Sequence, residues 1–282
     1  MTPTAWRCIA ASSIGTSHVR AGLPCQDSAE CRLFSARGDD PALVAVVSDG
    51  AGSAPESEEG SRLACSTASD AVLKLLQSGG TSRDVTREFA QSTIKDFQRE
   101  VSLRADGKGR TPRDFACTLL LAVVDDDGAA FLQIGDGAIV VGPRQEPDEY
   151  CWVFWPQRGE YENQTNFATD PGATDQLDHE VIEAPVDEVA LLSDGLQRLA
   201  LHYQSQTVHA PFFRPIFAPL RMARTGFSTP LSLSLARFLD SQPVNERTDD
   251  DKTLILATRR TAGDSADHYV DANEREDQTE SL

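Results

Sequence analysis

The sequence predicts a layered α+β fold, with helices outside and sheets inside. Short apolar runs bounded by turn residues predict several strands. Two other regions, one in the first half of the chain and one near its end, carry apolar residues at helical spacing. Sheets and helices that each bury an apolar face pack against one another as layers. The 282 residues suffice for one large domain or two small ones with a sizeable core.

Strands are predicted where an apolar run ends at glycine, proline or an acidic residue. They cover Trp6–Ser13, Ser28–Phe34, Leu43–Val47, Asp114–Val124, Ala129–Ile134, Ala138–Val141, Tyr150–Trp155, Val189–Leu192 and Thr253–Ala257. The run Asp114–Val124 is apolar along most of its length, which predicts a central position in a sheet. An Asp-Gly pair at 127–128 favours a hairpin turn after it.

Helices are predicted where apolar residues recur every three or four positions. One begins at about Glu56 and ends before Gly79, and a second spans about Arg83–Leu103, so the two should pack side by side. Shorter helices are expected at Leu196–Leu201 and, opened by a proline, at Leu231–Asp240.

Three regions are expected to be irregular. Thr16–Pro24 is typical of a loop, and three prolines should break residues 212–220 into short pieces. The polar stretch Pro156–Gln176 suits a surface flap that selects substrates.

The formal net charge of −18 argues against non-specific binding to nucleic acid or to an anionic membrane, because the long-range field would repel both. No segment approaches the roughly 20 apolar residues that span a bilayer, and the N-terminus lacks the apolar core of a signal peptide. We therefore expect a cytoplasmic protein whose partners are proteins or small molecules.

The last residues, 261–282, differ in composition from the rest of the chain. Between 262 and 282 there are seven acidic side chains, one arginine and few large hydrophobic residues. Such a segment buries too little apolar surface to fold, so we predict a disordered acidic tail after a folded domain of residues 1–260. The six cysteines lack the spacing of a zinc site and are interpreted as reduced thiols.

A Ser-Asp-Gly motif occurs twice, each time at the end of an apolar run. Asp49 and Asp194 belong to these motifs, while Asp27 and Asp250 stand just before other predicted strands. If these strand ends meet at one edge of the sheets, the four carboxylates converge there. Clustered carboxylates repel one another unless cations neutralise them, and their hard oxygen atoms suit Mg²⁺ or Mn²⁺. The sequence thus predicts a site for a pair of divalent ions.

The order of the motifs resembles that of the metal-dependent Ser/Thr protein phosphatases of the PPM, or protein phosphatase 2C-like, family. The resemblance runs from about Trp6 to Arg259. It rests on Gln26-Asp27, Ser48-Asp49-Gly50-Ala51-Gly52, Ala116-Cys117-Thr118, Ile134-Gly135-Asp136-Gly137, Leu192-Ser193-Asp194-Gly195 and Asp250-Asp251-Lys252-Thr253-Leu254. The segments Gly15-Thr16-Ser17-His18 and Pro24-Cys25-Gln26-Asp27 resemble a bacterial branch of the family. Its members often occur beside a Ser/Thr kinase and a von Willebrand A-type protein.

The resemblance implies a central β-sandwich of two antiparallel sheets flanked by pairs of helices, with two Mn²⁺ or Mg²⁺ ions at one end. A hydroxide between the ions would attack phosphoserine or phosphothreonine in a phosphoprotein, a dephosphorylation that serves signalling.

The resemblance also assigns roles to individual residues. Asp49 would bridge both ions, and the carbonyl of Gly50 would bind one of them. Asp194 and Asp250 would complete the other ion's shell, with Asp251 as the alternative to Asp250. Asp27 would hold metal-bound waters.

Two positions depart from the family's pattern around the substrate. Where many relatives have an arginine for the substrate phosphate, this chain has Gly22, so His18 or Arg20 is expected to bind phosphate instead. Arg198 occupies the place of a frequent partner of a third ion, which argues against a third ion at Asp136.

Two other functions stay open. A catalytically decayed module would keep the fold and bind a phosphoprotein or a kinase, although all four aspartates are present. An aspartyl-nucleophile phosphotransferase also uses strand-end aspartates with Mg²⁺ but wants a second aspartate where this chain has Ala51. Ala51 also replaces a histidine that some relatives carry as a proposed general acid.

Overall fold

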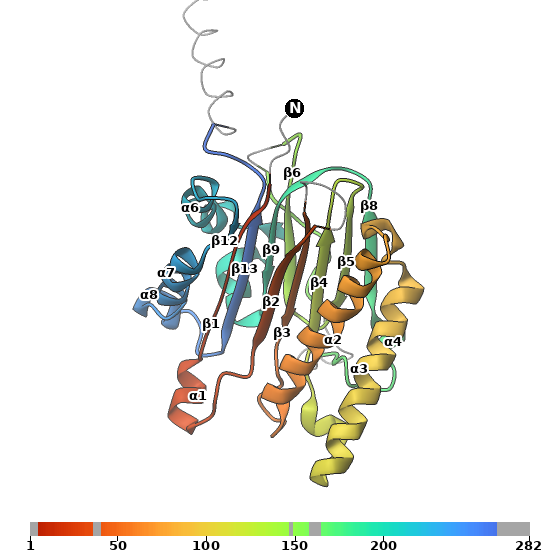
Figure 1. Ribbon diagram of the computed structural model, residues 1–282. Coiled ribbons are helices and arrows are strands. Elements are labelled where there is room, and N and C mark those ends of the chain that lie inside the picture. Colours follow the sequence, from red (N-terminus) through yellow and green to blue (C-terminus); the bar gives the residue numbers. More distant parts are fainter. Residues whose placement is uncertain (1–4, 36–40, 147–148, 158–164, 264–282) are drawn as a thin grey trace, which may run out of the picture.

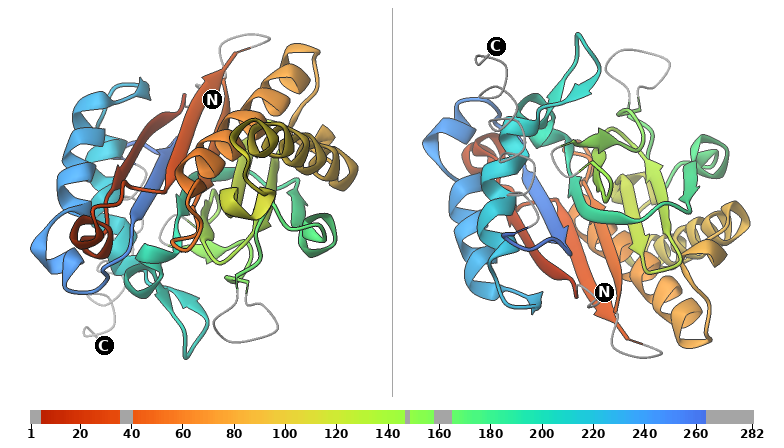
Figure 2. Two further views of the ribbon diagram at one scale, coloured as in Figure 1. Left: turned by 90° about the horizontal axis from the view of Figure 1, so that it is seen from below. Right: turned by 90° about the horizontal axis from the view of Figure 1, so that it is seen from above.

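Four layers make up the computed structural model, which describes residues 5–35, 41–146, 149–157 and 165–263 (Figure 1). Two sheets lie face to face at the centre, and helices cover the outer face of each (Figure 2). The predicted α+β sandwich is confirmed. The acidic tail predicted for 261–282 falls almost entirely outside the described residues, which end at Gly263.

The first sheet has five antiparallel strands in the order β2-β3-β4-β5-β8. They are β2 (Ser28–Phe34), β3 (Ala42–Ser48), β4 (Leu119–Val124), β5 (Ala129–Ile134) and β8 (Asp178–Ile182). The second sheet has six strands in the order β12-β1-β13-β9-β6-β7. They are β1 (Arg7–Ser13), β6 (Ala138–Pro143), β7 (Cys151–Trp152), β9 (Val186–Leu192), β12 (Gly226–Phe227) and β13 (Lys252–Thr258). The short β12 runs parallel to β1, and the other neighbours are antiparallel.

Two pairs of long helices form the outer layers (Figure 1). The first sheet is covered by α2 (Ser57–Gln77) and α3 (Arg87–Lys108), and the second by α6 (Ala210–Arg221) and α7 (Thr229–Leu239). The shorter elements are α1 (Thr16–Ala21), η1 (Ser82–Asp84), η2 (Pro112–Phe115), α4 (Ala173–Gln176), η3 (Asp194–Leu196), α5 (Gln197–Ala200), β10 (Leu201–His202), β11 (Thr207–Val208) and α8 (Gln242–Asn245).

Three apolar cores fill the spaces between the four layers. Along β3, Val44 and Val46 belong to the core beneath α2 and α3, whereas Leu43, Ala45 and Val47 belong to the core between the sheets. A third core joins β9 and β13 to α6 and α7. Because side chains alternate between the two faces of a strand and both faces are buried, the central strands appear in the sequence as continuous apolar runs.

The expectation that prolines would break residues 212–220 is wrong, since one helix, α6, spans them. Pro211, Pro215 and Pro219 are four residues apart and all exposed. The missing N–H groups therefore lie along the solvent face, while Phe213 and Phe217 anchor the opposite face in the core. Packing of the apolar face outweighs the lost hydrogen bonds.

Three other predictions need correction. Residues 16–21 form the helix α1 rather than a loop, and Gly22 ends it with a φ of 68°. The strand predicted over Asp114–Val124 begins only at Leu119, because η2 forms a turn that Thr111 and Asp114 cap. The aromatic strand at 150–155 is confined to β7.

Two further features concern the cysteines and the longest helices. All six cysteines are unpaired thiols. In the part of the chain that the structure describes, no helix has the length and apolar character needed to cross a membrane.

Gly60 tests how closely α2 packs on η2. A Cβ atom at residue 60 would lie 2.1 Å from the carbonyl oxygen of Phe115, so Gly60→Ala should push the helix from the turn. We expect the free energy of unfolding in urea to fall by about 1–3 kcal/mol. The matched control is Gly107→Ala in α3, where a Cβ meets no atom within 4 Å. It should raise the free energy of unfolding by about 0.5–1 kcal/mol, and equal effects of the two substitutions would contradict the packing.

Candidate active site

Strand-end aspartates of both sheets lie together at one end of the sandwich, the lower end in Figure 1. In the first sheet, β2 begins directly after Asp27 beside the end of β3, which Asp49 follows. In the second sheet, β13 begins directly after Asp251 beside the end of β9, which precedes Asp194 by two residues. The hydroxyl of Ser193 donates to Oδ2 of Asp27 at 2.7 Å and so joins the two sheets.

The carboxyl groups of Asp49 and Asp194 interact with each other. Burial raises the pKa of Asp49 well above its usual range, and the charges of Asp27 and Asp194 raise it further. Burial also raises the pKa of Asp194 to about 6, although the interaction with Asp49 opposes this shift. The two carboxyl groups therefore disfavour two negative charges side by side in the absence of a cation.

Asp27 is buried, and only part of its carboxylate has a hydrogen-bond donor. Burial raises the pKa of Asp27 to about 7, against the lowering effect of hydrogen bonds from Ser193 and Thr253. Among the described residues, neither Oδ1 of Asp27 nor Oδ1 of Asp194 has a partner, and both atoms are buried. Buried carboxylate oxygens without donors fit a divalent cation, which would supply the positive charge that these groups need.

The carboxylates of the cluster do not form a complete set of metal ligands by themselves. Between Ala5 and Gly263, leaving aside the undescribed gaps, no three His, Cys, Asp or Glu side chains converge closely enough to hold an ion by themselves. An ion here would therefore complete its shell with backbone carbonyls and water, as Mg²⁺ does when one or two carboxylates bind it. The residues present fit such a site.

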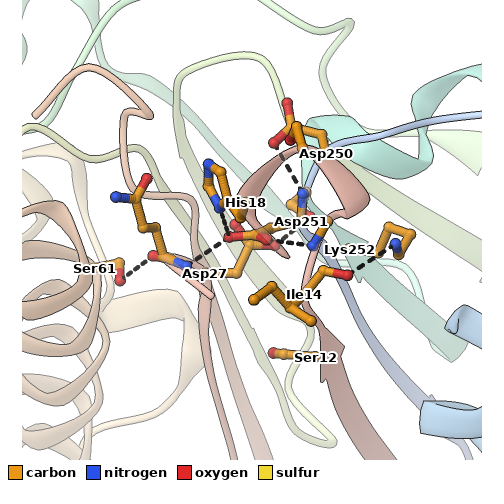
Figure 3. Close-up of polar contacts among 12 residues, drawn as sticks. Ser12, Ile14, His18, Asp27, Ser61, Asp250, Asp251 and Lys252 are labelled. Carbon is orange, nitrogen blue, oxygen red and sulfur yellow. Dashed lines mark hydrogen bonds and ion pairs between the residues drawn. The ribbon is translucent and has the colours of Figure 1, made fainter. Parts of the chain in front are cut away.

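Asp251 is buried and holds the N-terminal segment in place (Figure 3). Its carboxylate accepts hydrogen bonds from the backbone N–H groups of Gly15 and Gln26, each at 2.6 Å. Nδ1 of His18 lies 2.9 Å from the same carboxylate. Both oxygens of Asp251 thus have partners from the first thirty residues of the chain.

Asp250 differs from its neighbour in exposure and in the groups it affects. Its side chain is exposed, and one of its oxygens accepts the backbone N–H of Asp251 at 2.9 Å. The charge of Asp250 contributes to the raised pKa values of Asp49, Asp194 and Asp136. The charge of Asp251 contributes instead to the raised pKa of Asp27, so the two neighbours act on different members of the carboxylate cluster.

His18 and Arg20 both lie on α1 but have different surroundings. His18 is buried, and its Nε2 faces the loop after Asp49, where a Cβ at Gly52 would lie 3.7 Å away. Arg20 is exposed, and its Nη2 lies 3.3 Å from the carboxylate of Asp249, also exposed. His18 thus borders the cluster, whereas Arg20 belongs to a surface ion pair.

Gly50 stands where the backbone is crowded. It forms an isolated bridge with Cys117, and a Cβ added to it would lie 2.6 Å from the carbonyl oxygen of Gln26. No other residue fits without displacing the backbone.

Asp136 lies on the turn between β5 and β6 at the same end. Burial raises the pKa of Asp136, while a hydrogen bond from Oγ1 of Thr165, at 2.9 Å, opposes the shift. The amide of Gln197 donates to the carbonyl of Asp136. The next residue, Arg198, is exposed.

Sequence reasoning missed the residues that orient the aspartates. The hydroxyl of Ser193 bonds Asp27 and also accepts the backbone N–H of Thr253 at 2.9 Å. Oγ1 of Thr118 accepts the backbone N–H of Asp49 at 2.9 Å. The repeated serine before Asp-Gly was a usable signal for Ser193, and the motif Ala116-Cys117-Thr118 marked Thr118 without indicating its contact.

Asp251→Asn tests the anchoring of the N-terminal segment. An asparagine would turn an NH₂ group toward at least one N–H donor, so a hydrogen bond to a charged group is lost. We expect the free energy of unfolding in urea to fall by about 1.5–3 kcal/mol. Asp249→Asn removes an exposed pair and should change it by less than about 1 kcal/mol. Wild-type stability in the Asp251 variant would contradict the anchoring.

Known proteins resemble this chain in sequence and in fold. Residues 14–240 match the sequence model of the family described as protein phosphatase 2C. The chain is 38% identical over 256 residues to Serine/threonine-protein phosphatase 3 of Escherichia coli (strain K12), a match that covers 89% of this chain and 98% of that protein.

Solved structures share the fold at low sequence identity. A bacterial serine phosphatase aligns with a TM-score of 0.58 and 14% identity, covering 90% of this chain and 98% of that one. Stp1 from Staphylococcus aureus aligns with a TM-score of 0.56 and 15% identity, covering 89% and 94%. Because residues 14–240 match the sequence model of that family, the chain belongs to the protein phosphatase 2C family.

Proposed function

We propose that the protein is a Ser/Thr protein phosphatase that hydrolyses phosphoserine and phosphothreonine in a phosphoprotein with the help of two Mn²⁺ or Mg²⁺ ions. The observation that carries this is the group of strand-end carboxylates whose pKa values are raised by burial and by one another. Family membership and the name of the E. coli relative support the reaction. When bound, the ions would supply charge that neutralises the phosphoryl oxygens and lowers the pKa of the attacking water, so that hydroxide is available.

The carboxylates would divide between the two ions according to their neighbours. Asp49 interacts with both Asp27 and Asp194, which supports its proposed role as the bridge. The carbonyl of Gly50 is proposed as a ligand of one ion, and Asp194 and Asp250 as ligands of the other. Asp27 would accept hydrogen bonds from water in the site.

Asp251 and Asp136 are not proposed as metal ligands. Because both oxygens of Asp251 already accept hydrogen bonds, we propose that it positions the N-terminal segment rather than binding an ion. We propose no third ion at Asp136, because the hydroxyl of Thr165 already donates a hydrogen bond to that carboxylate.

His18 is proposed to bind the substrate phosphate. A histidine whose Nδ1 is held by a carboxylate has a fixed ring orientation, and its Nε2 faces the loop that follows Asp49. Arg20, the other residue predicted for this role, has the surface pair with Asp249 and no comparable support. The Ser/Thr kinase and the von Willebrand A-type protein stay predictions from the resemblance.

Asp49→Asn tests the metal-dependent reaction. Removing one of several repelling carboxylates should leave the metal-free protein at least as stable as wild type, while Mn²⁺ should raise the Tm of wild type only. Phosphate release from a phosphothreonine peptide should fall by about 100-fold or more. Asp106→Asn, at an exposed site on α3, is the matched control and should retain both responses.

Two results would count against the proposal. Activity of Asp49→Asn equal to wild type would contradict the two-metal reaction. Wild type that binds no Mn²⁺ in calorimetry, yet binds a phosphopeptide, would instead favour the decayed binding module.

His18→Ala and Arg20→Ala together test the phosphate contact. Loss of a hydrogen bond to a charged phosphate costs about 1.5–3 kcal/mol, so kcat/KM should fall by about 10- to 100-fold in the His18 variant. The Arg20 variant should stay within about 2-fold of wild type, because exposed ion pairs contribute little. The reverse order of the two effects, in steady-state kinetics, would assign the phosphate to Arg20.

A further inference from the structure

A polar pocket of about 730 Å³ lies beside the carboxylate cluster. Its walls come from three segments and include Ser53, Ala54, Arg113, Asp114, Phe167 and Asp170. Of the described residues, the lining set contains none of Asp27, Asp49, Asp194 and Asp250. The volume is that of a ligand subsite, so the pocket is large enough for groups that lie next to a phosphate rather than for the phosphate alone.

One wall of the pocket is fastened to the loop after Asp49. Three backbone hydrogen bonds make this connection: Thr118 N–H to the Asp49 carbonyl at 2.8 Å, Ala51 N–H to the Ala116 carbonyl at 2.9 Å, and Glu56 N–H to the Asp114 carbonyl at 2.8 Å. They hold η2, and with it the backbone of Arg113, at a constant position relative to Asp49.

The opposite wall also contacts the cluster. Thr165 lines the pocket, and its hydroxyl donates to the carboxylate of Asp136 at 2.9 Å. Asp136 stands on the turn between β5 and β6, at the end of the sandwich where the strand-end aspartates lie. A substrate chain in the pocket would therefore run directly beside the carboxylates.

The guanidinium group of Arg113 places a positive charge in this pocket, although the chain as a whole has a net charge of −18. Its side chain is exposed, and no ion pair joins it to another residue of the described ranges. The two acidic side chains of the pocket have local donors: Asp114 accepts from Thr111, and Asp170 accepts the backbone N–H of Phe167 at 3.0 Å.

We propose that the pocket binds the residues that flank the phosphorylated side chain, and that Arg113 binds an aspartate or glutamate among them. The inference rests on the proposed phosphatase function and names its substrate class, proteins with acidic residues next to the phosphorylated serine or threonine. A guanidinium group binds a carboxylate through two parallel hydrogen bonds. Asp114 and Asp170 carry negative charge in the same lining, so recognition depends on the paired hydrogen bonds of the Arg113 guanidinium and not on the net charge of the pocket.

Three substrates separate this role from phosphate binding. They are a phosphothreonine peptide with flanking glutamates, the same peptide with glutamines instead, and para-nitrophenyl phosphate, each assayed with Mn²⁺. Wild type should prefer the acidic peptide. Arg113→Ala should raise KM for that peptide by about 10-fold, with kcat unchanged, and should leave the other two substrates within about 2-fold.

Arg110→Ala is the matched control. Arg110 is also exposed, lies three residues away and pairs with Glu56 at 3.4 Å, so its loss should alter none of the three assays. Arg113→Lys keeps the charge without the paired donors and should recover part of the affinity for the acidic peptide.

Three outcomes would overturn the proposal. They are a wild type without preference for the acidic peptide, an Arg113→Ala variant that keeps full affinity for it, and an equal loss on all three substrates. The proposed phosphatase function fails in a different way. A wild type that releases no phosphate from any of the three substrates with Mn²⁺ would contradict that function whatever the Arg113 variants do.

Discussion

Repulsion among buried carboxylates is the constraint on which the rest of this structure depends. Asp27, Asp49 and Asp194 lose hydration at one end of the sandwich, and their pKa values rise as a result. Such a group is unfavourable for the metal-free protein, and it persists because three apolar cores hold the strand ends in place. The apolar contacts that stabilise the fold therefore lie along the strands, whereas the carboxylates of the candidate site lie where the strands end.

Contacts between distant parts of the chain complete the site. Asp251, near the C-terminal end of the fold, accepts hydrogen bonds from Gly15 and Gln26, which lie 236 and 225 residues before it. Ser193 joins Asp27 of one sheet to β13 of the other. These bonds explain why α1, an element outside both sheets, borders the carboxylates, and why His18 reaches the loop after Asp49.

Much of the fold could be predicted because it follows from local patterns. Strands buried on both faces leave apolar runs that end sharply, and β3, β5 and α2 lie within a few residues of their predicted positions. The errors arose where packing outweighs local preference. The prolines of α6 are compatible with a helix because the missing N–H groups lie on the exposed side, and no local pattern indicates which side that is.

The sequence by itself determined which carboxylates stand at strand ends, because a strand end is marked by the residues on either side of it. Only the tertiary structure decided between neighbours in the chain. Asp251 faces inward to backbone donors, while the exposed Asp250 adds its charge to the surroundings of Asp49 and Asp194. His18 borders the cluster, while Arg20 pairs at the surface. Arg113 has no motif of its own and gains its position through backbone bonds to the loop after Asp49. The physical reason is that a side chain's role depends on which of its donors and acceptors are already used, and the groups that use them lie up to 236 residues away.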